Sequence, residues 1–147
     1  MLFTDEHFMK KALNEAEYAI ERGEVPVGAV IVNNNQIIAK AYNQVELLND
    51  VTAHAEIIAM TATANAIGAK YLNDCTLYVT LEPCLMCAGA SYWSQIGRIV
   101  IGARDQKRGY NRLNDSSILH PKTEVKWGVM EDECGKVLID FFKEMRK

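Results

Sequence analysis

The sequence of 147 residues lacks the segments that would insert it into a membrane. No apolar run approaches the roughly 20 residues that a membrane-spanning helix needs. The first ten residues, MLFTDEHFMK, lack the basic stretch and the following apolar stretch of a secretory signal peptide. Repeats, linkers and low-complexity segments are also missing, and the length fits one ordinary domain. We therefore expect residues 1–147 to form a single cytoplasmic domain with no membrane partner.

An excess of positive charge is missing too, since the formal net charge is −3 at pH 7. Domains that bind nucleic acids usually carry a basic surface, so the overall composition does not favour such a partner. Positive charge is nevertheless concentrated in two segments, which are 104–112, with Arg104, Lys107, Arg108 and Arg112, and the C-terminal FFKEMRK. These segments predict either a local basic surface or ordinary solvated loops, and charge alone does not separate the two.

Cysteine is scarce, with single residues at positions 75, 84, 87 and 134. Disulfides belong mainly to secreted proteins, and this sequence has no recognisable leader. Metal binding or simple burial therefore explains these thiols better than pairing into disulfides.

Hydrophobic periodicity predicts helices interleaved with strands. Helices are expected over 4–22 and 52–66, from Pro83 to about Ser94, and near the C-terminus; strands are expected over 27–32, 36–42, 75–80, 98–103 and 124–129. Three asparagines at 33–35 predict a tight hairpin turn, and Pro83 suits the first position of a helix. This order favours an α/β fold, a three-layer α-β-α sandwich with a mixed five-stranded sheet. The relative direction of the last two strands stays open.

Three side chains have the types and spacing of a catalytic zinc site. Cys84 and Cys87 lie three residues apart at the predicted start of a helix, so both thiolates can reach one ion. His54 adds an imidazole ligand at the start of another helix. Three protein ligands leave the fourth tetrahedral position open to water, which is typical of catalytic rather than structural zinc. We therefore predict one Zn²⁺ per chain, bound by His54, Cys84 and Cys87.

Glu56 is the residue that a structural metal site would not need. Two positions after His54, its carboxylate can lie beside the water on the metal and move protons during hydrolysis. Taken singly, a glutamate in a first helical turn is usually a charge that compensates the helix dipole, and a lone C-x-x-C can be a redox pair. The joint pattern H-x-E…P-C-x-x-C is the signature of zinc deaminases of nucleobases. The sequence therefore predicts hydrolytic deamination with Glu56 as the catalytic residue.

Longer motifs make the sequence resemble the bacterial tRNA-specific adenosine deaminases over nearly the whole chain. They are E-V-P-V-G-A-V at 24–30, A-Y-N at 41–43, T-A-H-A-E-I at 52–57, T-L-Y-V-T-L-E-P-C-L-M-C-A-G-A at 76–90, G-A-R-D-Q-K at 102–107 and F-F at 141–142. The resemblance implies a cytidine-deaminase-like fold and conversion of the wobble adenosine to inosine in a tRNA anticodon stem-loop by a homodimer. It also implies substrate contacts from Asn43, the backbone of Ala55, Asp105 and Lys107.

Two segments depart from this pattern and keep alternatives open. After Lys107 the family usually continues with a Gly-Ala-x-Gly-Ser-like stretch, whereas 108–113 read Arg-Gly-Tyr-Asn-Arg-Leu. The segment 89–93, with Tyr92 and Trp93, is similar to the one in bacterial guanine deaminases. The alternative is therefore a deaminase of a free base or nucleoside, with guanine first and cytosine second. A zinc-bearing scaffold without turnover is a third hypothesis, against which Glu56 and the missing fourth ligand argue.

Overall fold

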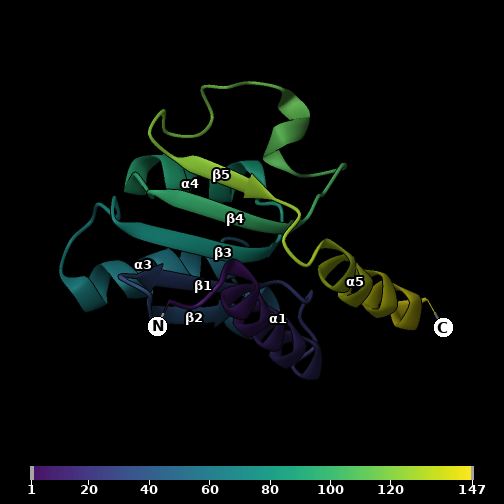
Figure 1. Ribbon diagram of the computed structural model, residues 1–147. Coiled ribbons are helices and arrows are strands. Elements are labelled where there is room, and N and C mark those ends of the chain that lie inside the picture. The colour runs from purple at the N-terminus through teal and green to yellow at the C-terminus, as the bar shows by residue number, and fades with distance from the viewer. Residues whose placement is uncertain (1, 147) are drawn as a thin grey trace.

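One mixed sheet of five strands forms the centre of the fold (Figure 1). The computed structural model describes residues 2–146. The strands are β1 (Gly28–Asn33), β2 (Gln36–Tyr42), β3 (Cys75–Leu81), β4 (Arg98–Ala103) and β5 (Glu124–Trp127), in the spatial order β2-β1-β3-β4-β5. Strand β1 is antiparallel to β2 and β3, whereas β3, β4 and β5 are parallel. The predicted mixed sheet is confirmed, and the pair whose direction the sequence left open is parallel.

Helices cover both faces of the sheet and complete the three layers. Helices α1 (Asp5–Glu21) and α5 (Glu131–Met145) share one hydrophobic cluster with the sheet, and α3 (Ala55–Ile67) and α4 (Leu85–Ser94) share the other. Two short helical segments, α2 (Val45–Leu48) and η1 (Tyr110–Leu113), lie in connections for which the sequence predicts no helix or strand. The predicted α-β-α sandwich is confirmed. None of the helices within residues 2–146 has the length and apolar character of a membrane-spanning segment.

The predicted start of the helix at Thr52 is wrong by three residues, because α3 begins at Ala55. The backbone N–H and the hydroxyl of Thr52 both donate to the Asp50 carboxylate, at 2.8 and 2.7 Å. These bonds keep Thr52 in a turn, and the chain stays extended until His54, which is the N-cap. The shift therefore moves a predicted zinc ligand to the exact junction between loop and helix.

The predicted role of Pro83 as the first helical residue is also wrong. Helix α4 begins at Leu85 with Cys84 as its N-cap. The preceding residues stay extended because the N–H of Glu82 donates to Ala103 O and the N–H of Tyr110 donates to Pro83 O, at 2.8 and 2.9 Å. A second predicted zinc ligand thus also occupies an N-cap.

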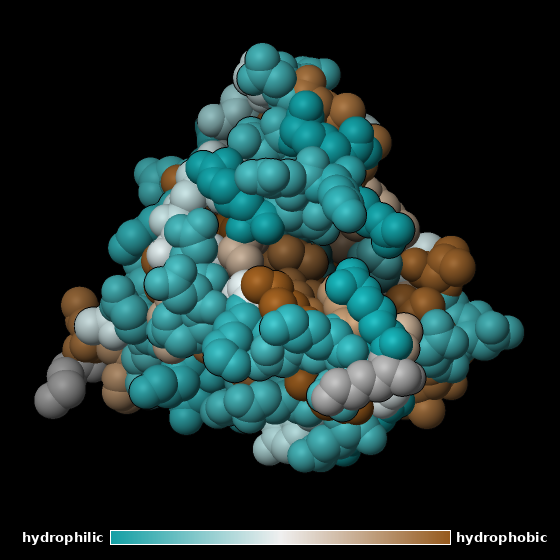
Figure 2. Space-filling model, turned by 90° about the vertical axis from the view of Figure 1, so that its right-hand side faces the viewer, coloured by the Kyte–Doolittle hydropathy of each residue, from teal (hydrophilic) through white to brown (hydrophobic). Residues whose placement is uncertain are grey.

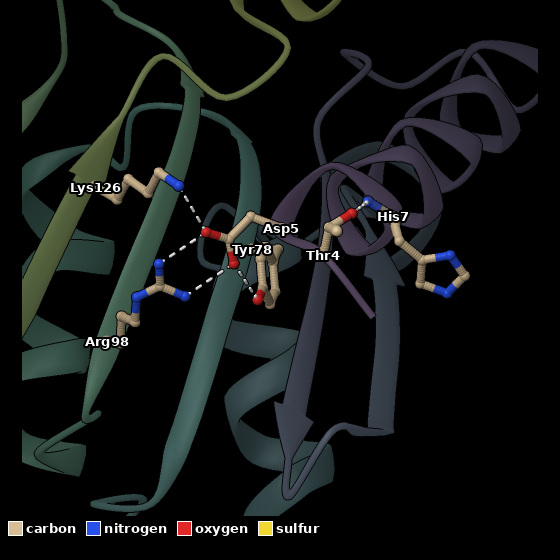
Figure 3. Close-up of polar contacts among 6 residues, drawn as sticks. All are labelled: Thr4, Asp5, His7, Tyr78, Arg98 and Lys126. Atoms are coloured by element: carbon tan, nitrogen blue, oxygen red, sulfur yellow. Dashed lines mark hydrogen bonds and ion pairs between the residues drawn. The ribbon is translucent and has the colours of Figure 1, made fainter. Parts of the chain in front are cut away.

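Asp5 connects α1 to three strands of the sheet (Figure 3). Its carboxylate accepts two hydrogen bonds from the Arg98 guanidinium, at 2.9 and 2.8 Å, and one each from Tyr78 and Lys126, at 2.7 and 2.9 Å. Thr4 caps the same helix by accepting from the N–H of His7. The bonds from Arg98 above all hold the pKa of Asp5 well below its usual range. These contacts fix the N-terminus of α1 against the sheet.

We expect Asp5→Asn to lower the free energy of unfolding at pH 7 by about 1–3 kcal/mol, the usual cost of losing hydrogen bonds to a charged group. Because the folded-state pKa is depressed, the stabilisation is complete above the unfolded pKa of about 4 and is lost as pH falls further. The difference in the free energy of unfolding between the two proteins, measured by urea unfolding, should therefore be constant from pH 7 to about pH 5 and become smaller as pH falls to 3. Asp74→Asn, at an exposed site, is the control. A constant difference across this pH range would contradict the account.

Candidate metal centre

The three predicted zinc ligands meet where α3 and α4 begin. His54 is the N-cap of α3, Cys84 is the N-cap of α4, and Cys87 lies in the first turn of α4. These two helices lie on the same face of the sheet. The unpaired N–H groups and the dipole at a helix N-terminus favour negative charge, so this position stabilises thiolates.

The distances within the group match those of a tetrahedral zinc site. Nδ1 of His54 lies 3.6 Å from Sγ of Cys84 and 3.4 Å from Sγ of Cys87. Zinc bonds of about 2.05 Å to nitrogen and 2.3 Å to sulfur at tetrahedral angles place these atoms about 3.5 Å apart. Among residues 2–146, the ligand atoms that cluster in this way come from these three residues. The donor set therefore fits a zinc ion with a fourth position left for a non-protein ligand.

Contacts within the group favour a thiolate at Cys84. The hydrogen bond from the Cys87 thiol is the main cause that lowers the pKa of Cys84 to about 4, and the hydrogen bond with His54 lowers it further. The same contact with Cys84 raises the pKa of His54. The pKa of Cys87 is raised, because its thiol donates to Cys84 and is itself buried. A bound zinc ion would favour the thiolate form of both cysteines, so it would lower the pKa of Cys87 rather than raise it.

Glu56 lies in the first turn of α3 and is directed to the metal group. Its side chain is 4% exposed and interacts with the Cys87 thiol, and burial raises its pKa to about 7. Its Oε1 is buried without a hydrogen-bond partner within the described chain. Buried carboxylate oxygens are normally satisfied, so an unpartnered one beside a ligand group indicates a place for a bound molecule. A carboxyl in this environment can accept and donate a proton close to neutral pH.

Asn43 and Ala55, both predicted to contact substrate, are brought together by the structure. Oδ1 of the buried Asn43 accepts from the N–H of Ala55 at 2.8 Å, across the start of α3. Asn43 therefore satisfies an N–H at the first residue of the helix, between His54 and Glu56. Whether substrate also contacts these two residues stays a prediction.

Asp105 and Lys107 lie in the loop that follows β4. Oδ1 of Asp105 accepts from the N–H groups of Lys107 and Arg108, at 3.2 and 3.0 Å, so it shapes the loop itself. The side chain of Lys107 is exposed. Gly109 of this loop forms a β-bridge with Cys84, which places the loop next to the metal group. Contacts of Asp105 and Lys107 with the substrate remain a prediction.

Two buried glutamates, Glu24 and Glu82, are functional candidates that the sequence motifs did not single out. Glu24 accepts from the N–H groups of Glu46 and Leu47, and Glu82 accepts from those of Asp105 and Asn111. Both residues occur inside quoted motifs, at 24–30 and 76–90. A signal was present in each case, since Glu24 lies four residues before β1 and Glu82 lies two residues before the metal ligand Cys84.

Comparisons with known proteins agree with this site. The family described as "Cytidine and deoxycytidylate deaminase zinc-binding region" matches residues 3–103. The tRNA-specific adenosine deaminase of Bacillus subtilis (strain 168) is 47% identical, over 97% of this chain and 91% of its own length. A solved structure from a study of A-to-I editing by tRNA:A34 deaminases at the wobble position has a TM-score of 0.84 and 42% identity, covering 90% of this chain and 99% of its own.

A guanine deaminase is also similar, but over less of both chains. The X-ray structure of guanine deaminase from Bacillus subtilis is 40% identical with a TM-score of 0.67, covering 69% of this chain and 66% of its own. The tRNA-specific adenosine deaminase of Aquifex aeolicus (strain VF5) instead combines 45% identity with coverage of 96% of this chain and 95% of its own length. The chain therefore belongs to the cytidine and deoxycytidylate deaminase family of zinc-binding proteins and, within that family, to the tRNA-specific adenosine deaminases.

Proposed function

We propose that this protein converts adenosine to inosine in tRNA, at the wobble position of the anticodon loop, by zinc-dependent hydrolysis. The observation that carries the proposal is the His54, Cys84 and Cys87 group with the unpartnered Oε1 of Glu56 buried beside it. The nearly full-length similarity to tRNA-specific adenosine deaminases supports the choice of substrate. We further propose that residues 1–147 act as one deaminase domain, since a single sheet joins both halves of the site. For a bacterial enzyme of tRNA, the corresponding location is the cytoplasm.

The proposed chemistry exchanges the exocyclic amine of adenine for oxygen. Zinc, when bound, supplies Lewis-acid activation of a water. Glu56 Oε1 accepts a proton from the attacking water and delivers it to the ring nitrogen next to the reacting carbon. The second proton of the water passes through the same carboxylate to the leaving amine, so that adenosine and water give inosine and ammonia. Asn43 keeps the start of α3, and with it Glu56, in register with the metal ligands.

We propose that the substrate approaches from the carboxyl ends of the parallel strands. Cys84 follows β3 at this edge, and ligands of open α/β sheets usually bind there. Figure 2 shows the side of the molecule toward which β5 runs, where hydrophilic residues surround a recess with hydrophobic residues at its floor. A polar rim with an apolar floor suits a base that leaves its stack and presents a charged backbone outside.

An assay of four substrates separates this proposal from the alternatives. Pure zinc-loaded protein is incubated separately with bulk tRNA, adenosine, guanine and cytosine, and ammonia release and inosine content are measured. We expect inosine in tRNA and little ammonia from the free bases. Rapid turnover of guanine or cytosine without inosine in tRNA would instead support the free-base deaminase. No ammonia from any of the four would support the scaffold without turnover.

Basic side chains of the loop after β4 are proposed to contact RNA phosphates. Arg104, Lys107, Arg108 and Arg112 are all exposed, and Arg104 lies over the Trp127 ring at 4.1 Å. Within residues 2–146, the ion pairs do not include any of these four. Lys143 and Arg146 near the C-terminus are exposed too, and Lys147 lies outside the described residues. A local basic surface on an acidic protein is thus available for the proposed substrate.

Replacing Lys107 and Arg108 by Ala is expected to raise KM for tRNA by about tenfold or more at low salt and to reduce its salt dependence. Each phosphate contact that is lost removes about one unit from the slope of log affinity against log salt. The measurement is KM between 50 and 200 mM KCl, with zinc content as a check on the site. Lys10→Ala with Lys11→Ala, on α1, is the matched control for loss of two charges. An unchanged salt slope would contradict the proposed phosphate contacts.

Homodimerisation is proposed through the outer face of α4. Met86 and Trp93 are 37% and 77% exposed and lie seven residues apart, on one side of the helix. Leu85 is a further exposed apolar residue in the same turn as Met86. An apolar helix face of this kind is typical of a protein interface.

Light scattering at micromolar concentration should report about twice the 16.5 kDa of one chain. We expect Trp93→Glu to shift the protein toward monomer, because a charge would be buried without a partner. Tyr18→Glu, at an exposed aromatic residue on α1, is the matched control and should remain dimeric. A wild-type monomer at this concentration would refute the proposed dimer.

A further inference from the structure

Glu82 is a buried carboxylate that lies between the end of β3 and the zinc ligand Cys84. Its side chain is 4% exposed. Oε1 accepts from the N–H of Asp105 at 3.0 Å, and Oε2 accepts from the N–H of Asn111 at 2.9 Å. The two donors are the ends of the loop 105–111, so one side chain binds both ends of that loop.

The loop closes tightly around this carboxylate. A Cβ at Gly109 would lie 2.0 Å from Oε2 of Glu82, so only glycine fits there. Gly109 also forms the bridge to Cys84, and the N–H of Tyr110 donates to Pro83 O at 2.9 Å. The carboxylate and the loop backbone therefore form one packed unit against the segment that carries the metal ligand.

Within residues 2–146, the hydrogen bonds to the Glu82 carboxylate come from backbone N–H groups. Among residues 2–146, the ion pairs do not include Glu82. Burial of a carboxylate is costly unless hydrogen bonds satisfy it, so the loop and the side chain depend on each other. Asp105 in turn accepts from the N–H groups of Lys107 and Arg108, so the contacts that begin at Glu82 also hold the backbone of these two basic residues in place.

We propose that Glu82 is a positioning residue for RNA binding, which keeps the loop 105–111 in place so that Lys107 and Arg108 are presented beside the metal centre. This inference rests on the proposed function, because it takes tRNA as the substrate. A loop that is ordered before binding loses less conformational entropy when it contacts RNA. The residue therefore contributes to KM rather than to the chemical step.

Glu82→Gln tests the proposal with little change in shape. The amide keeps one acceptor but replaces the other with an NH2 group, which cannot accept from Asp105 or Asn111. We expect faster amide hydrogen exchange in 104–113, retention of zinc, a KM for tRNA raised by roughly tenfold and kcat within about twofold. A purely structural role would lower thermal stability without separating KM from kcat at 20 °C.

Glu24→Gln is the matched control, because it removes the same kind of interaction from a different loop. Glu24 is 2% exposed and accepts from the N–H groups of Glu46 and Leu47, at 3.0 and 2.8 Å. Its replacement should accelerate exchange around α2 and leave 104–113 unchanged. In the background of Lys107→Ala with Arg108→Ala, Glu82→Gln should add little to KM, since residues that act through one contact are not additive.

Three results would overturn the proposal: unchanged exchange in 104–113, unchanged KM for Glu82→Gln, or the same KM increase with and without Lys107 and Arg108. A different result would refute the proposed function itself: the wild-type protein would form no inosine in tRNA. Amide hydrogen exchange in 104–113 needs no substrate, so it tests the role of Glu82 in the loop independently.

Discussion

Glu56→Gln is expected to reduce turnover on tRNA by at least about two orders of magnitude while zinc remains bound. The amide has nearly the same volume and keeps hydrogen-bonding capacity, but it cannot accept a proton, and general acid–base catalysis is typically worth about 10²–10⁴ in rate. The side chain is not one of the three clustered ligands, so metal content should be unchanged. Single-turnover rates and zinc analysis of the same preparation give both quantities.

Glu6→Gln is the matched control for this experiment. Glu6 is exposed in the first turn of α1, so it shares the helix position of Glu56 without the burial or the metal group. If Glu56 acted only through the helix dipole, both variants would lose a few tenths of a kcal/mol of stability and retain activity. A near-normal rate for Glu56→Gln would therefore refute its role as proton carrier.

Replacing either cysteine of the metal centre is expected to remove zinc and to destabilise the fold at the same time. Cys84 and Cys87 lie at the start of α4 and His54 lies at the start of α3, so a bound ion joins two helix starts that are 30 residues apart in the chain. A metal ion that binds the folded state but not the unfolded state stabilises the fold. For Cys84→Ser and Cys87→Ser we expect less than a tenth of the wild-type zinc content and a Tm lower by roughly 10 °C.

Cys75→Ser is the control for the loss of a thiol without the loss of a ligand. Cys75 is 2% exposed and packs in the core beneath α3 and α4. Its replacement should cost stability through packing and an added buried hydroxyl but leave one zinc per chain. Full zinc occupancy in both Cys84→Ser and Cys87→Ser would contradict the assigned ligands.

The metal centre could be predicted from the sequence because each ligand has a local signature. Cys84 and Cys87 are three residues apart, and His54 and Glu56 share one turn, so short-range spacing relates the members of each pair. The joint H-x-E…P-C-x-x-C signature, rather than spacing, predicted that the two pairs meet. The hairpin is similar: Asn34 and Asn35 adopt positive φ angles of 53° and 62°, as the tight turn between β1 and β2 requires. Local chemistry was therefore sufficient for the turn and for each half of the metal centre.

Interactions between distant segments could not be predicted in the same way. Glu82 precedes Asn111 by 29 positions, and Glu24 precedes Leu47 by 23, and no periodicity in the sequence relates such pairs. The two misplaced helix starts have different origins. A local turn with Asp50 keeps Thr52 outside α3, whereas contacts with Ala103 and Tyr110 keep Glu82 and Pro83 outside α4, so tertiary contacts overrode local propensity only at the second start.

The most direct test of the central claim is the identity of the edited nucleotide. Wild-type zinc-loaded protein is incubated with tRNA, and the RNA is reverse-transcribed and sequenced, since inosine is read as guanosine. We expect conversion at the wobble adenosine of the anticodon loop, with none in a parallel reaction with Glu56→Gln. Unaltered wobble adenosine after incubation with fully metallated wild-type protein would refute the proposed activity.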